Sequence, residues 1–170
     1  EIQYRHPHEE KIVEETKALL AETETGKKLL ALAEETKTEV RVLNSPDYQG
    51  FITNSYVVYM TMPSLEQTAK YAQAIILAYS LKEVMHISMG YPRPRWPQDK
   101  DRYFGVNHGK NLDIVVESCR MVREFEEQNR PEAVESLKNM GLEEVYRGFI
   151  AGQNPKQLFE TYRESLKKRG

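Results

Sequence analysis

SLEQTAKYAQAIILAYSLKEVMHIS, residues 64–88, is the stretch that decides the fold. Ser64 and Gln67 form a capping box, a pattern typical of a helix N-terminus, and the run continues to Ser88 without glycine or proline. Its middle, residues 74–78, is apolar on every face. In a water-exposed protein such a helix has to be surrounded by other elements. The stretch therefore predicts a long central helix around which the rest of the chain packs.

The second half of this predicted helix carries the candidate polar site. Tyr79, Glu83 and His86 recur at spacings of three and four and so lie along one stripe, with Ser80 beside them. The alternative interpretation is that Tyr79 and Glu83 are a satisfied polar edge of the core. In that case His86 faces solvent near the helix C-terminus, where a positive charge suits the helix dipole.

Length, charge and cysteine content limit the class of protein. The 170 residues predict a single domain, residues 1–170, and the formal net charge of −2 supplies no electrostatic argument for nucleic acid or an anionic membrane. Charged residues bracket the apolar run well before it reaches the roughly 18 residues of a membrane span. The single Cys119 excludes an internal disulfide and is expected to be buried. We expect a cytoplasmic protein that does not enter a membrane.

Ahead of the central helix, the pattern predicts N-terminal helices over residues 8–36 and a small sheet over 38–62. The helices are expected at 9–21 and 27–36, with a break at 23–26 and an extended tail before residue 8. Strands are expected at 38–43, which alternates, and at 54–62, which is rich in β-branched and aromatic residues. We expect 54–62 to be an exposed edge strand, which favours self-association or addition of a peptide strand.

After the central helix, residues 89–109 predict a long loop and residues 110–169 predict C-terminal helices. The loop holds Tyr91, Arg93, Arg95 and Trp96, a mixture of basic and aromatic groups that suits a binding surface, including one for single-stranded nucleic acid. Alternatively, these residues only pin the loop to the core. Helices are expected at 111–128, 132–140, 142–151 and 156–168. The predicted fold class is α+β, mostly α, with a two- or three-stranded sheet packed on the central helix.

The order of these elements and the segment from Leu77 to His86 (LAYSLKEVMH) carry a resemblance to a known family. The chain resembles small bacterial zincin-like metallopeptidases, whose central helix reads LAHELRHAWQ and follows a strand that binds an extended peptide. The resemblance spans about residues 26–117. It implies a zincin-like fold, a zinc ion and hydrolysis of peptides. Where the family has its first histidine, glutamate and second histidine, this chain has Tyr79, Ser80 and Glu83.

These departures imply a scaffold without peptidase chemistry. Zinc hydrolases need ligands that leave one position open and a general base beside the bound water. Tyr79 and Ser80 supply neither an imidazole nor a carboxylate. The family's third ligand, an acidic residue on the next core helix, corresponds to Asp113 or Glu117. We therefore expect a pseudoenzyme that binds a protein or peptide partner, with no catalytic residues and no cofactor.

Two alternatives remain open at this point. Glu83 and His86 form an E-x-x-H pair, the spacing with which helices of carboxylate bundles present two ligands to one ion. With Asp113 or Glu117 they predict zinc or another divalent metal in a metal-dependent hydrolase. The second alternative is nucleic-acid binding through the loop that carries Arg93, Arg95 and Trp96.

Overall fold

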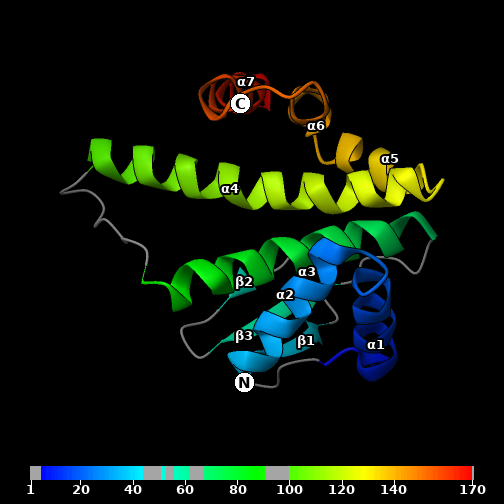
Figure 1. Cartoon of the computed structure of the whole chain (residues 1–170). Helices are drawn as coiled ribbons and strands as arrows, with labels where there is room; N and C mark the ends of the chain where they lie inside the picture. The colour runs from blue at the N-terminus through cyan, green and yellow to red at the C-terminus, as the bar shows by residue number, and fades with distance from the viewer. Residues whose placement is uncertain (1–4, 44–50, 53–55, 62–66, 91–99, 170) are drawn as a thin grey trace.

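The fold is mostly helical with one small sheet, as the sequence predicts (Figure 1). The computed structural model describes residues 5–43, 51–52, 56–61, 67–90 and 100–169. Within these ranges the helices are α1 Glu9–Leu20, α2 Glu24–Glu35, α3 Gln67–Ser88, α4 Lys100–Glu127, α5 Glu132–Asn139, α6 Glu143–Ile150 and α7 Pro155–Arg169. The strands are β1 Glu39–Leu43, β2 Phe51–Ile52 and β3 Val57–Thr61.

The sheet has the order β1-β3-β2, with β1 parallel and β2 antiparallel to β3. The prediction of an edge strand over 54–62 is therefore wrong, because β3 has a partner on both sides. The side chains of Val58 and Met60 of β3 are buried and point to the same face of the sheet, toward the helices. Val42 of β1 is also buried and pairs with Met60. This burial suits the central place of β3. Of the described strands, β1 and β2 lie at the edges of the sheet, and the sequence pattern did not single out β2.

Residues 5–8, the described part of the chain before α1, are bonded to the sheet and end in a turn, so the prediction of an extended tail is wrong for them. Arg5 forms an antiparallel bridge with Leu43, and the backbone N–H of His6 donates to the Val42 carbonyl oxygen at 2.9 Å. These bonds use the outer edge of β1. Backbone pairing rather than any side-chain pattern holds this segment, which is why hydropathy did not predict its position.

Helix α2 begins earlier than expected because its N-terminal N–H groups find partners. The Thr23 side chain accepts from the Gly26 N–H at 2.9 Å, and the Glu124 carboxylate of α4 accepts from the N–H groups of Glu24 and Thr25 at 2.6 and 3.2 Å. A carboxylate at a helix N-terminus also stabilises the helix dipole. The predicted break at 23–26 is therefore the first turn of α2.

Helices α3 and α4 form the centre of the molecule, and in Figure 1 they lie side by side, with α6 and α7 on the far side of α4. The predicted loop at 89–109 is wrong over 100–109, which is the start of α4. The last proline of that segment is Pro97, so none of its later residues lacks the backbone N–H that a helix needs. The two glycines at 105 and 109 lower helix propensity without preventing the helix.

One apolar core connects the described helices with β1 and β3. Ala74, Leu77 and Ala78 of α3 are fully buried, which confirms that this helix is surrounded by other elements. Tyr71 of α3 packs edge-to-face on Phe125 of α4, with ring centroids 5.3 Å apart. No helix among the described residues is both long and apolar enough to span a membrane.

Candidate functional site

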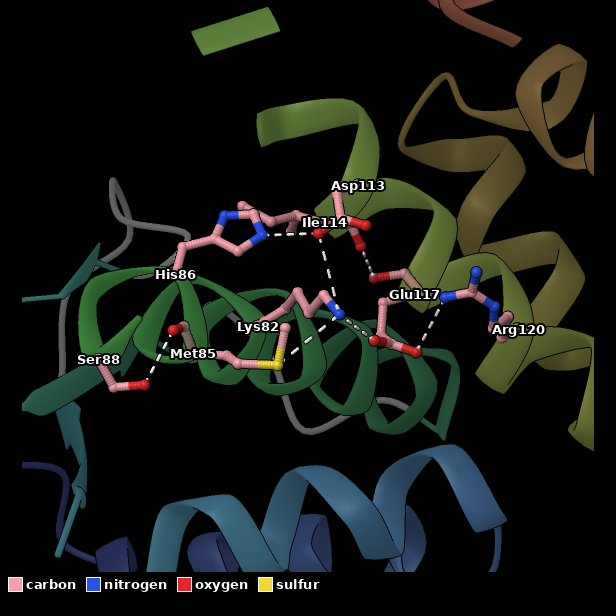
Figure 2. A network of polar contacts seen from close by, with 9 residues as sticks. Lys82, Met85, His86, Ser88, Asp113, Ile114, Glu117 and Arg120 are labelled. Carbon is pink, nitrogen blue, oxygen red and sulfur yellow. Dashed lines mark hydrogen bonds and ion pairs between the residues drawn. The ribbon is translucent and has the colours of Figure 1, made fainter. Parts of the chain in front are cut away.

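A polar network lies where α3 and α4 face each other, and Figure 2 shows its members. His86 Nε2 is 2.6 Å from Asp113 Oδ2. Lys82 Nζ is 2.6 Å from Glu117 Oε2 and 3.9 Å from the same Asp113 oxygen. Arg120 Nη1 approaches the other oxygen of Glu117 at 3.3 Å. Basic and acidic side chains thus alternate along the interface between the two helices.

Burial divides this network into a dry inner part and a wet outer part. The side chains of His86 and Lys82 are 2% and 9% exposed, whereas that of Asp113 is 43% exposed. Glu117 lies between these extremes at 15%. Buried charges are stable only when paired, so the Lys82–Glu117 pair satisfies both ions. The imidazole is buried with one ring nitrogen on a carboxylate that water can reach.

The structure corrects the interpretation in which His86 faces solvent at the helix end. Helix α4 covers this end of α3, and Asp113 provides a hydrogen-bond partner that compensates for burial of the ring. Asp113 and Glu117, the two residues that the resemblance offers as a third metal ligand, both contact side chains of α3, and their role as ligands stays a prediction. His86 is therefore a member of the interface between α3 and α4.

Tyr79 and Glu83 belong to a second polar group beside the network. The Tyr79 hydroxyl lies 3.5 Å from Asn111 Oδ1 of α4. Burial, together with smaller contributions from the charges of Glu83 and of Tyr162 on α7, raises the pKa of Tyr79 to about 12. Tyr79 is thus a neutral phenol at physiological pH. Ser80, the remaining candidate, is buried at 4% exposure.

Lys82 is the residue that sequence reasoning missed. The sequence pattern indicates only a charge that ends the apolar run, yet the side chain is buried and bonds Glu117. Its position one turn before His86 was the available signal, because residues i and i+4 lie on the same helix face. The predicted set of Glu83, His86 and Glu117 for a metal is not brought together: among the residues that the structure describes, no three histidine, cysteine or acidic side chains are grouped as metal ligands.

Tyr91, Arg93, Arg95 and Trp96 lie outside the described residues, so the interpretations placed on them stay predictions. Cys119 is fully buried, as expected, and burial raises the pKa of its thiol to about 12.

Comparison with known protein families, with curated proteins and with solved structures finds no match for this chain.

Proposed function

We propose that this chain is a non-catalytic, peptidase-like scaffold that binds an extended segment of a protein or peptide at the outer edge of β2, an edge that pairs with no strand among the described residues. The observation that carries the proposal is the sheet order β1-β3-β2, in which β2 is an edge strand and the outer edge of β1 is already bonded by the chain itself. An edge strand offers backbone N–H and C=O groups, and addition of a strand is a common way to bind peptides.

The chemistry of α3 supports a binding role over hydrolysis. Catalysis needs an activated group that reaches substrate and water. Tyr79 is a neutral phenol and Ser80 is buried, while Lys82 pairs with Glu117 at 2.6 Å and lies 3.9 Å from Asp113. These features favour a helix that holds α4 in place.

The proposal is tested by selecting a displayed library of random linear dodecapeptides on the folded protein and measuring binders by fluorescence anisotropy. Consecutive strand residues direct their backbone groups to alternate sides, so one of Phe51 and Ile52 presents its N–H to the open edge. Phe51→Pro and Ile52→Pro are therefore matched variants. The one that faces outward should keep the fold and bind about fivefold more weakly, because a lost hydrogen bond of about 1 kcal/mol corresponds to about a fivefold change in Kd.

Circular dichroism and thermal unfolding identify which proline variant keeps the fold. Binding that is unchanged in that variant would place the peptide elsewhere and refute the β2 edge as the site. A library that yields no binder to the wild-type protein would also count against the proposal. A Lys82→Met variant that stays folded should bind the peptide normally, since the network is formed by α3 and α4.

A further inference from the structure

The outer edge of β1 is closed by the chain's own N-terminal segment through two hydrogen bonds to Val42, one of which belongs to a backbone bridge. The Val42 N–H donates to Glu9 Oε2 at 2.9 Å, and the Val42 carbonyl accepts from the His6 N–H at 2.9 Å. Arg5 and Leu43 form the antiparallel bridge next to them. Val42 thus has both of its outward backbone groups satisfied, one by a backbone and one by a carboxylate.

The carboxylate of Glu9 is held in this position. Its other oxygen lies 3.3 Å from Arg41 Nη1, and the Glu9 side chain is only 15% exposed. Glu9 also opens α1, where a negative charge suits the helix N-terminus. One side chain therefore links the start of α1 to the strand edge. A charged group directed at an edge N–H is a recognised means of preventing further strand pairing.

We propose that residues 5–9 are an edge guard that prevents β1 from pairing with β1 of a second copy of this chain. The edge already accepts an antiparallel neighbour at Leu43, and two identical strands related by a two-fold axis also pair antiparallel. The guard and the second copy would compete for the same N–H and C=O of Val42. This inference is independent of peptide binding at β2.

The sequence of β1 favours a second copy as the competing partner. Its residues read Glu39, Val40, Arg41 and Val42, and a two-fold axis at Val40 places Glu39 of each copy opposite Arg41 of the other. Opposite charges directly across an antiparallel pair are stabilising, and like charges are destabilising. In the monomer, Arg41 Nη2 already lies 3.2 Å from Glu39 Oε2, so both side chains are on the same face of the strand.

The test removes both contacts to Val42 in the full-length chain by combining His6→Pro with Glu9→Ala, a double variant that we call the open-guard variant. Proline at position 6 has no N–H to donate, and alanine at position 9 has no carboxylate. Sedimentation velocity over a hundredfold range of concentration should show self-association at least tenfold tighter than that of the wild type. The matched control is Glu10→Ala, which removes an exposed glutamate from the same turn of α1 and should behave as wild type.

A charge reversal identifies the surface that pairs. Adding Glu39→Lys to the open-guard variant puts a positive charge opposite Arg41 of the other copy and should return the protein to the wild-type sedimentation profile. If the open-guard variant is folded and associates no more than wild type, the proposal is wrong; association that persists with Glu39→Lys also overturns it. Should the double variant fail to fold, Glu9→Ala alone frees the Val42 N–H, and hydrogen exchange at that N–H then supplies the readout. The proposal expects protection that rises with protein concentration, and concentration-independent protection overturns it.

Discussion

Replacing Lys82 with methionine is the most direct test of the network between α3 and α4. The change keeps an unbranched side chain of similar length and removes the ammonium. Glu117 would then lose its 2.6 Å partner while remaining only 15% exposed, and Asp113 would lose a charge 3.9 Å away. We expect the free energy of unfolding to fall because a carboxylate is left largely buried without that partner.

The distances set the size of the effect. At 2.6 Å the Coulomb attraction of the Lys82–Glu117 pair is roughly 6 kcal/mol at an effective dielectric constant of about 20, and desolvation of the two ions offsets much of it. Removing one member of a buried pair costs about 3–5 kcal/mol. Glu117 keeps Arg120 at 3.3 Å, so we expect the lower value, about 3 kcal/mol. In a chain of this size that lowers Tm by roughly 6–12 °C.

Urea unfolding followed by circular dichroism measures these changes. The double variant Lys82→Met with Glu117→Leu should recover to within about 1 kcal/mol of wild type, because an apolar pair can replace a buried ion pair at little cost. Lys11→Met is the matched control, since Lys11 and Glu15 are 75% and 58% exposed at 3.9 Å and contribute less than about 0.5 kcal/mol. The reasoning is refuted if Lys82→Met is as harmless as Lys11→Met, or if the double variant loses the sum of both single losses.

Three further predictions concern other buried groups. Helix propensity alone predicts that Gly26→Ala stabilises α2 by about 1 kcal/mol. The added Cβ, however, would lie 1.9 Å from the Leu20 carbonyl oxygen. We therefore expect urea unfolding to show that the free energy of unfolding falls by about 2 kcal/mol, which is a typical cost of overpacking. Cys119 should resist iodoacetamide at pH 8.5 in the native protein, because burial raises its thiol pKa to about 12, and should gain one adduct by mass spectrometry in guanidinium. The phenol of Tyr79 ionises near 10 when unfolded, and its pKa is about 12 when folded. Its stabilising contribution is therefore complete below pH 10 and lost as pH rises through 12, so Tyr79→Phe should flatten the fall in unfolding free energy over that interval.

Much of the fold was predictable because burial and capping leave local signals. The all-apolar centre of α3 predicted its position, and the capping box of Asn154 and Gln157, with bonds of 2.9 and 3.0 Å, starts α7 where the sequence places it. The place of β3 within the sheet was not predictable in the same way. Strand order depends on which backbone groups pair across the sheet, and side-chain alternation within one strand does not contain that information.

The sequence named several residues of the network, but it did not show which side chains of α3 pair with which side chains of α4. Spacing placed Tyr79, Glu83 and His86 on one helix face, and Asp113 and Glu117 were named only through the resemblance to the metallopeptidase family. Spacing could not show that Lys82 reaches across to Glu117, because the register between two packed helices is set by the fit of their apolar side chains. A buried lysine is rare, so the sequence favoured exposure until a carboxylate partner was known.

The position of Lys82 also bears on the choice between a binding scaffold and a metal-dependent hydrolase. A divalent cation and an ammonium group compete for the same carboxylate oxygens. A metal held by His86, Asp113 and Glu117 would first have to displace Lys82, leaving a buried ammonium without its carboxylate, which is strongly unfavourable. That penalty would have to be offset before the metal gained any net affinity. Strand addition at β2 carries no such penalty, because it adds hydrogen bonds to an edge strand without breaking a buried pair. The charges of the network therefore favour the binding role that we propose for this chain.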